Sequence, residues 1–176
     1  MQAFLVVRHQ HPHTNTKSGA AAETRTVQVI VDTREQTPWT FEGQSITTKR
    51  AKLDAGDYSI VGLEHRVAIE RKSLDDWTST VLRDRARFYR ELELLRALDF
   101  RCVVIESGVR EIMAGAYKSQ ASPAAVLGFV AEVTVAQSVP VYLAGSRAEA
   151  QLLAGAFLRM AAKKLSAGVD EKPTAR

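Results

Sequence analysis

The sequence predicts a mixed α/β domain in which helices flank a central mixed β-sheet. Strand-like segments gather in the first part of the domain, and helical and strand-like segments then alternate toward the C-terminus. Composition adds a third observation, because 45% of the 176 residues are hydrophobic, which is enough to build one buried core. No internal repeat or second domain is visible, so we expect one domain over residues 27–165.

The expected strands are short, apolar and rich in β-branched residues. A Gly-Asp turn at residues 55–57 and a loop at residues 62–66 separate the early ones. The pattern predicts strands at residues 27–31, 46–53, 58–61, 67–72, 101–106 and 141–143.

The expected helices carry capping residues and apolar stripes at helical spacing. Ser73 and Ser122 stand at N-cap positions, Pro123 follows in a first turn, and Ser146 has the spacing of a capping box with Glu149. The pattern predicts helices at residues 73–81, 87–98, 122–137 and 146–165.

The two ends of the chain lack periodicity. Residues 1–26 are polar and turn-rich, which predicts a flexible tail, and residues 166–176 are expected to be disordered. His9, His11 and His13 alternate in the first tail, but no carboxylate or cysteine lies near them, so a solvated tail is favoured over a metal site.

Charge and cysteine content limit the function classes. The formal net charge is +4, which fits a polyanionic partner such as DNA. The one cysteine, Cys102, lies in an apolar run and cannot form an internal disulfide framework or a thiolate zinc site. No apolar run is long enough to span a membrane, and we expect an intracellular protein, cytoplasmic or nucleoid-associated.

Chemistry is indicated by Asp57 and by the triplet Glu70-Arg71-Lys72. Residues two apart on a strand share a face, so Glu70 and Lys72 project together. A hairpin between the third and fourth strands would bring Asp57 close to Glu70. Carboxylate oxygens suit Mg²⁺ or Mn²⁺, which can act on a phosphoryl group. The alternative is an ordinary Gly-Asp turn and an exposed charged triplet.

Three more acidic residues belong to the candidate set. Asp32 and Glu35 stand where the first strand ends, and sites in open α/β sheets gather at strand ends, although a turn role is the alternative. Asp76 follows the fourth strand, and its alternative role is to cap the helix that begins at Ser73.

These motifs together resemble the nuclease domain of the XPF-type structure-selective endonucleases. That family's pattern is Gly-Asp, a variable gap, Glu-Arg-Lys, three residues and Asp, matched here by Gly56-Asp57, Glu70-Arg71-Lys72 and Asp76. The run from Val31 to Glu35 belongs to the same pattern. The likeness continues through Arg87, Glu91 and Glu106, and covers roughly residues 27 to 143.

The resemblance implies a restriction-endonuclease-like fold and Mg²⁺- or Mn²⁺-dependent hydrolysis of DNA phosphodiester bonds. It implies that Asp57 and Glu70 hold the metal, that Asp32 joins them directly or through water, and that Lys72 serves the attacking water. Arg71, Glu35 and Asp76 would support the site.

Family members favour branched or partly single-stranded DNA, as in repair, recombination or phage DNA processing. Many carry a tandem helix-hairpin-helix domain and dimerise through it. This chain is too short to hold that domain, so we expect a compact nuclease, of a kind that would suit a phage, and leave a homodimer open.

Basic and aromatic residues near these motifs are candidates for DNA contact. On a continuous helix, Arg83, Arg87 and Arg90 would share one face, and a solvated, paired face is the alternative. Trp39 and Phe41 could stack on a splayed base or pack at the edge of the core. The candidate DNA-binding residues are Arg83, Arg85, Arg87, Arg90, Lys49, Arg50 and Lys52.

Three hypotheses remain at this stage. The first is a metal-dependent endonuclease. The second is a catalytically idle DNA-junction-binding module of the same fold, which runs behind because no acidic residue or lysine of the motif is missing. The third is an interaction domain that uses a stripe of Leu153, Phe157 and Met160, for which core packing is the alternative.

Overall fold

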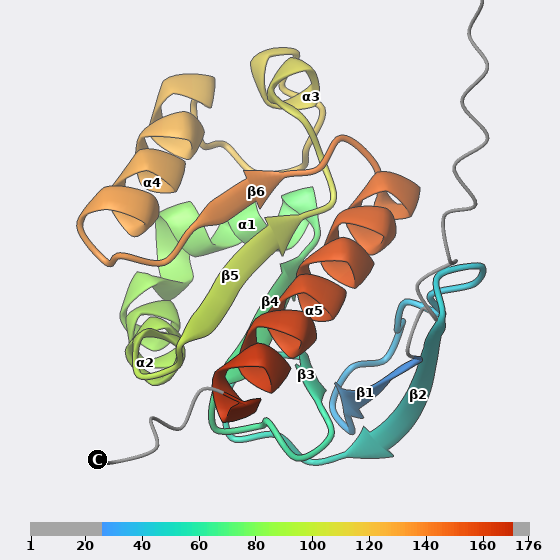
Figure 1. Cartoon of the computed structure of the whole chain (residues 1–176). Coiled ribbons are helices and arrows are strands. Elements are labelled where there is room, and N and C mark those ends of the chain that lie inside the picture. The colour runs from blue at the N-terminus through green and yellow to red at the C-terminus, as the bar shows by residue number, and fades with distance from the viewer. Residues whose placement is uncertain (1–25, 171–176) are drawn as a thin grey trace, which may run out of the picture.

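The protein folds into a six-stranded β-sheet with helices on both faces, which confirms the predicted mixed α/β class (Figure 1). The structure is a computed structural model that describes residues 26–170. The strands are β1 (Val27–Asp32), β2 (Ile46–Ala51), β3 (Tyr58–Ile60), β4 (Val67–Lys72), β5 (Phe100–Ile105) and β6 (Val141–Leu143). The helical elements are α1 (Leu74–Ser79), η1 (Thr80–Asp84), α2 (Arg85–Arg96), α3 (Val109–Met113), α4 (Pro123–Val135) and α5 (Arg147–Asp170).

The strand order is β2-β1-β3-β4-β5-β6, and every strand except β3 runs in the same direction. The carboxyl ends of β1, β4 and β5 therefore meet at one edge of the sheet. Since β3 is antiparallel, its first residue lies at that same edge. This topology brings the residues that follow β1, precede β3 and end β4 and β5 into one neighbourhood, as expected for a strand-end site.

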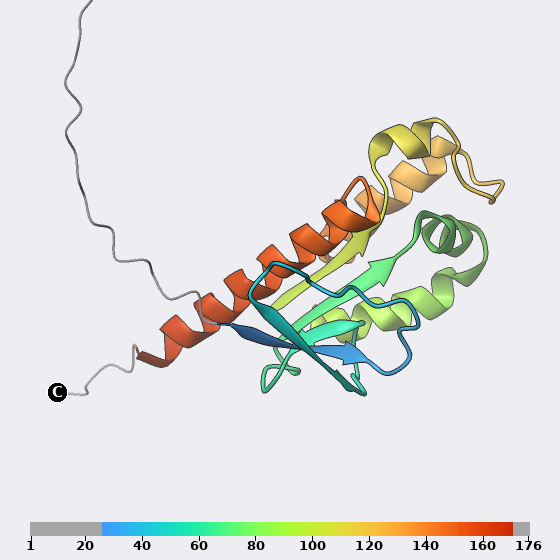
Figure 2. The same cartoon turned by 90° about the vertical axis from the view of Figure 1, so that its right-hand side faces the viewer.

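Each face of the sheet buries a separate apolar cluster. On one face, α5 lies diagonally across the sheet, and its alanines and leucines pack on side chains of β1, β3, β4 and β5 (Figures 1 and 2). On the other face, residues of α1, α2, α3 and α4 pack on β4 and β5 around Trp77, Phe88 and Phe129. A sheet that buries both faces has no spare surface for a ligand except at its ends and edges.

The candidate stacking aromatics belong to the first of these cores. Trp39 and Phe41 are each 1% exposed, and the Trp39 ring stacks on Tyr58 with ring centroids 4.5 Å apart. The stacking role for a splayed base is therefore wrong, and the alternative of core packing is correct. Cys102 is buried as predicted. Leu153 and Phe157 pack against the same core, which leaves only Met160 of the proposed interaction stripe exposed.

The helix that follows β4 is not continuous. Ser73 caps α1 as predicted, but the π-helical turn η1 connects α1 to α2. A π turn adds a residue to the helical repeat and changes which side chains share a face beyond it. Arg83 lies in η1, whereas Arg87 and Arg90 lie in α2. The regular helical spacing that was expected to place all three on one face therefore holds only for Arg87 and Arg90.

Other differences from the sequence prediction lie at element ends. Helix α3 was not predicted, because its five residues are too short to show a period. Helix α5 continues to Asp170, past the predicted end near residue 165, since no proline intervenes to stop it. Residues 1–25 and 171–176, which include the three histidines, lie outside the described residues. No helix within residues 26–170 is long and apolar enough to cross a membrane.

Candidate active site

The β3–β4 hairpin joins Asp57 to the Glu-Arg-Lys strand, as the sequence predicted. Asp57 N–H donates to Ile69 O at 2.8 Å, and the Asp57 carboxylate Oδ2 accepts from Arg71 N–H at 2.8 Å. On its other side, Asp57 O accepts from Asp32 N–H at 2.8 Å. Gly56 makes this approach possible, because its φ is +69° and a Cβ there would lie 2.8 Å from Ile69 O.

Asp57 and Glu70 form a pair of like charges in which Glu70 is buried and Asp57 is half-buried. Burial is the largest influence on Asp57, and repulsion by Glu70 adds to it, so that its pKa rises to about 7. Burial likewise raises the pKa of Glu70, although Lys72 opposes the shift. Two carboxylates that resist ionisation are stabilised by any cation placed between them.

Lys72 is the cation that the protein itself supplies at this pair. Its Nζ lies 2.7 Å from Glu70 Oε1 and 3.6 Å from Glu91 Oε2, above the Phe88 ring. Burial alone would lower the pKa of Lys72, but the charge and hydrogen bond of Glu70, together with the charges of Glu91 and Asp57, outweigh burial and raise it. Glu91 Oε2 is buried without a hydrogen-bond partner among the described residues. The ammonium is thus held charged between two acidic groups.

Asp32 is committed to other hydrogen bonds. Its carboxylate accepts from the backbone N–H of Arg34 and of Leu53, and from the Arg34 guanidinium through Nε at 2.7 Å and Nη2 at 3.1 Å. Burial alone would raise the pKa of Asp32, but these bonds bring it down to about 2. With four donors on its two oxygens, Asp32 holds Arg34 at the site rather than pointing a free oxygen at the pair.

Arg34 is a site residue that sequence reasoning missed. Its side chain is 67% exposed, yet Asp32 and Leu53 O fix its Nε and Nη2. The charges of Asp57 and Glu70 also act on it, so the guanidinium lies near the pair. A fixed, accessible guanidinium beside two carboxylates is suited to contact a phosphate.

Arg71 projects away from Glu70 and Lys72, as strand alternation predicted, into a second group of charges. Its guanidinium donates to Glu106 through Nε and Nη2, both at 2.8 Å, and to Glu35 Oε2 at 3.1 Å. Glu35 and Arg71 are therefore in direct contact. Neither Glu106 nor Arg147, which donates to Glu106 at 2.8 Å, was assigned a role from sequence.

Asp76 lies apart from these groups and has the alternative role. Ser73 Oγ accepts from Asp76 N–H at 3.1 Å, which caps the N-terminus of α1, and donates to Asp76 Oδ2 at 2.6 Å. Asp76 is exposed and makes no hydrogen bond to Arg71 or Lys72 in the described part of the chain.

The candidate DNA-binding residues divide into exposed and engaged groups. Arg83, Arg87, Arg90, Lys49 and Lys52 are exposed, and Arg87 has only a long ion pair with Glu91 at 3.9 Å. Arg85, in contrast, lies over the Phe129 ring and pairs with Glu132. Arg50 donates to the carbonyls of Thr33 and Glu35 and so anchors the loop after β1.

The residues present fit a magnesium-like ion at the Asp57–Glu70 pair. The described residues contain no cluster of three or more His, Cys, Asp or Glu side chains arranged around one ion. Mg²⁺ does not need one, because it binds through one or two carboxylates and completes its shell with waters and substrate phosphate oxygens. Two hard carboxylates with raised pKa values therefore match this ion, and Asp57 and Glu70 would be its ligands.

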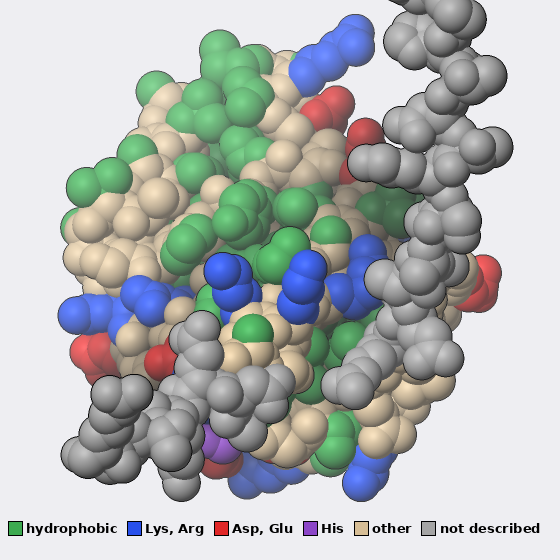
Figure 3. Space-filling view, viewed as in Figure 1, with side chains coloured by type: hydrophobic (Ala, Val, Ile, Leu, Met, Phe, Trp, Pro, Cys, Tyr) green, Lys and Arg blue, Asp and Glu red, His purple; other side chains and the backbone are tan. Residues whose placement is uncertain are grey.

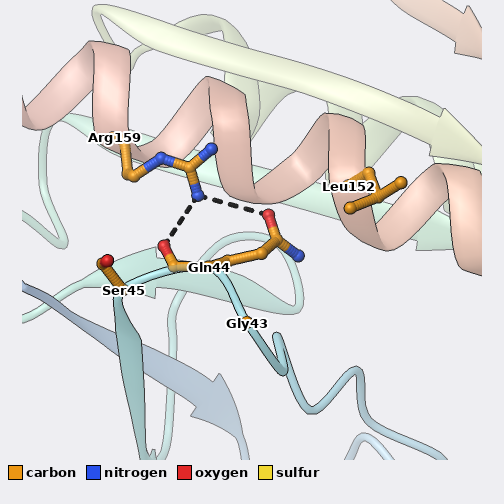
Figure 4. A pocket seen from close by; sticks show the side chains of 5 residues that line it. All are labelled: Gly43, Gln44, Ser45, Leu152 and Arg159. Carbon is orange, nitrogen blue, oxygen red and sulfur yellow. Dashed lines mark hydrogen bonds between the residues drawn. The ribbon is translucent and has the colours of Figure 1, made fainter.

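One cavity of the described residues lies elsewhere, between the β1–β2 connection and α5. It is lined by Gly43, Gln44, Ser45, Leu152 and Arg159. Figure 4 shows Arg159 reaching from α5 to the backbone and side-chain oxygens of Gln44, with bonds of 2.9 and 3.2 Å. Since it includes none of the candidate site residues, it is not part of the active site.

Comparisons with known proteins agree with this fold. The ERCC4 domain matches residues 31–155, and no curated protein matches the chain in sequence. The structure of XPF from Aeropyrum pernix is 15% identical, with a TM-score of 0.61, over 81% of this chain and 69% of that chain. XPF from Aeropyrum pernix in complex with DNA is also 15% identical, with a TM-score of 0.59, over 78% and 66%. The chain therefore belongs to the ERCC4 domain family and has the restriction-endonuclease-like fold of the XPF nuclease domain.

Proposed function

We propose that this chain is a Mg²⁺- or Mn²⁺-dependent endonuclease that hydrolyses phosphodiester bonds in DNA. The observation that carries the proposal is the Asp57–Glu70 pair at the strand edge, with the Lys72 ammonium 2.7 Å from Glu70. Membership of the ERCC4 domain family supports it. So does the completeness of the motif, because an idle module is expected to lack an acidic residue or the lysine.

Each charged side chain has a distinct role in the proposal. A divalent ion held by Asp57 and Glu70 would supply positive charge for the phosphoryl oxygens and acidify a bound water. Lys72 orients the attacking water and steadies developing negative charge, and Glu91 retains the ammonium when Glu70 turns to the ion. Arg34, oriented by Asp32, contacts the phosphate.

DNA is held by residues beside the site. Arg83, Arg87 and Arg90 are exposed on η1 and α2, the segments that follow Lys72 in the chain, and are suited to backbone phosphates. Contacts to phosphates do not read the base sequence, so the shape of the DNA determines the preferred substrate. We propose branched or partly single-stranded DNA, processed in repair, recombination or phage replication. The complex of Aeropyrum pernix XPF with DNA supports DNA as the partner, by likeness of fold.

The test is cleavage of end-labelled flap, fork, nicked and plain duplex DNA with Mg²⁺, Mn²⁺ or EDTA. Wild type is expected to cut only with a divalent ion and to prefer the branched substrates, and Asp57→Asn is expected to be inactive. Asp54→Asn is the matched control, since Asp54 is exposed in the same turn. DNA binding without cutting on every substrate would move the idle junction-binding module to first place.

A homodimer is part of the proposal, supported by apolar surface. Hydrophobic side chains gather over the face where α4, β6 and α5 lie (Figure 3). Patches of this kind often mark contact surfaces. Light scattering during gel filtration should give twice the chain mass for wild type and the chain mass for Val135→Lys; a monomeric wild type would remove the dimer from the proposal. The exposed large hydrophobic residues of α3, α4, β6 and α5 are Val109, Met113, Val135, Tyr142, Leu152 and Met160.

A further inference from the structure

Glu106 is the meeting point of three elements behind the site. Its Oε1 accepts from Trp39 Nε1, Arg71 Nε and Arg147 Nη1, each at 2.8 Å, and its Oε2 accepts from Arg71 Nη2 at 2.8 Å. Burial alone would raise the pKa of Glu106, but the bonds from Arg71 and Trp39 outweigh it and lower the pKa. The carboxylate is therefore fixed in its charged form.

Arg147 fastens Glu106 to the loop that follows β1. While Nη1 bonds Glu106, Nη2 donates to Thr37 O at 2.6 Å and to Pro38 O at 2.9 Å. Arg147 is the first residue of α5, so a single guanidinium connects the start of this helix, the end of β5 and the loop that carries Glu35.

Glu35, Arg71, Glu106 and Arg147 form one group of four charged residues. Arg71 connects this group to the Asp57 carboxylate. The Arg71 side chain is held by Glu106 and Glu35, while its backbone N–H donates to Asp57 Oδ2. The group holds two cations, Arg71 and Arg147, and two anions. Loss of Arg147 would remove the contacts that hold Glu106 against the loop after β1 and so loosen the hold of Glu106 on Arg71.

We propose that Arg147 and Glu106 are a positioning pair, which fixes Arg71 and thereby the orientation of Asp57 for its divalent ion. The inference rests on the proposed function. Partners of metal ligands that lie outside the coordination shell commonly change metal affinity or activity by about 10- to 100-fold when they are removed. Neither residue touches the ion or the DNA, so the effect falls on ion affinity and turnover.

The competing explanation is that these ion pairs only stabilise the fold. Arg147 is 45% exposed, and half-exposed ion pairs contribute little to stability. A structural role would lower the melting temperature and leave the affinity for Mn²⁺ unchanged. Measuring both quantities on the same variants separates the two.

The variants are Arg147→Gln and Arg147→Lys, with Arg159→Gln as the matched control. Arg159 is also an α5 arginine that donates to the connection between β1 and β2, but it contacts none of the four charged residues (Figure 4). Mn²⁺ affinity is measured by titration calorimetry without DNA, and kcat and KM are measured on a labelled fork.

For Arg147→Gln we expect about 10-fold weaker Mn²⁺ binding, a similar fall in kcat at fixed Mn²⁺ and a DNA KM within about twofold of wild type. Arg147→Lys should recover part of the affinity, because it restores the charge without the planar fork. Arg159→Gln should bind Mn²⁺ as wild type does. Wild-type Mn²⁺ affinity and kcat in Arg147→Gln, with only a lower melting temperature, would overturn the positioning role.

A second readout needs no metal. The indole N–H of Trp39 donates to Glu106, whereas that of Trp77 is buried without a partner among the described residues. In a ¹⁵N correlation spectrum, Arg147→Gln and Glu106→Gln should each shift the Trp39 indole resonance and leave Trp77 as the internal reference. An unshifted Trp39 resonance in both would show that the pair does not act as one unit.

The outcomes also separate this inference from the proposed function. A wild type that binds Mn²⁺ without cutting DNA would overturn the nuclease alone, since the Mn²⁺ and indole measurements still report on the pair. A wild type that cuts, with Arg147→Gln unchanged in every measurement, would overturn the pair alone. A wild type that binds no Mn²⁺ would overturn both.

Discussion

At the scale of single residues, the proposed site depends on Asp57, a carboxylate whose charged form is disfavoured by burial. Asp57 has a pKa near 7 in the folded chain against 3.8 for an ordinary aspartate, chiefly because it is buried. The folded state therefore holds its proton more tightly than the unfolded state. By linkage, stability is lost as the pH rises from about 4 to 7 and stays reduced above that range.

The first prediction follows because ionisation of Asp57 destabilises the folded state. In EDTA at pH 8, Asp57→Asn should unfold at a higher denaturant concentration than wild type, by a free energy on the order of 2 kcal/mol, because asparagine carries no charge to bury. At pH 4 the difference should disappear. The measurement is urea denaturation at both pH values.

Asp54→Asn serves as the control for this prediction and should match wild type, because Asp54 is exposed. Added Mn²⁺ should reverse the ranking, since it binds and stabilises only the wild-type pair. If Asp57→Asn is no more stable than wild type at pH 8, ionisation of Asp57 does not destabilise the folded state, which contradicts the prediction.

Lys72 gives the second prediction. Lys72→Ala should lower the cleavage rate by about 100- to 1,000-fold, the usual effect of removing one group that stabilises transition-state charge. DNA affinity should stay within about twofold, because the ammonium is paired with Glu70 and Glu91 and not presented to solvent. Single-turnover cleavage and anisotropy binding measure the two quantities. Weak binding with normal turnover of bound DNA would contradict the role.

At the scale of elements, the β3–β4 hairpin sets the spacing of the two carboxylates. The turn that leads into β3 needs glycine at position 56 twice over, for a positive φ and for the closeness of Ile69 O. Gly62, at the other end of β3, has φ of +80° but open space around the position of a Cβ. Substitutions at Gly56 and Gly62 therefore distinguish the cost of backbone strain from the cost of a steric clash.

The third prediction uses this pair of glycines. Gly62→Ala should destabilise the fold by about 1 kcal/mol through strain alone, whereas Gly56→Ala should cost more than about 2 kcal/mol because the alanine methyl also meets the Ile69 carbonyl. Chemical denaturation midpoints give both values. Equal costs would mean that the hairpin relaxes freely around Gly56, and Asp57 would then be less firmly placed than argued.

At the scale of the whole molecule, the basic residues of η1 and α2 should determine how DNA binding responds to salt. Replacing Arg90, which is exposed, by alanine should reduce the slope of log affinity against log salt by about 0.9 if it neutralises one phosphate. Arg85→Ala should leave the slope unchanged, because Arg85 is occupied by Phe129 and Glu132. A lower slope in Arg85→Ala alone would place the DNA on a different face.

The fold class and the hairpin could be predicted from sequence because both follow from local patterns. Strand alternation put Glu70 and Lys72 on one face with Arg71 on the other, and the Gly-Asp turn put Asp57 beside them. Such residues lie within a few positions of a recognisable turn or strand end.

The missed features depend on contacts between distant segments. Arg147 meets Thr37 from 110 positions away, and no local pattern announces that contact. The π-helical turn has no sequence signature, so the face shared by the arginines was drawn on a continuous helix. Trp39 lies in a polar stretch, and only the fold of the loop over Tyr58 makes it part of the core. Arg34 was passed over because a lone arginine in a turn is ordinary.

The central claim is that Asp57 and Glu70 together hold a divalent ion, and anomalous diffraction from a crystal soaked in MnCl₂ tests it most directly. One anomalous peak is expected within coordination distance of both carboxylates, about 2.0 to 2.2 Å from an oxygen of each. The Lys72 side chain is expected to have turned from Glu70 toward Glu91. A crystal that binds Mn²⁺ only at other residues, from protein that still cuts DNA, would contradict it.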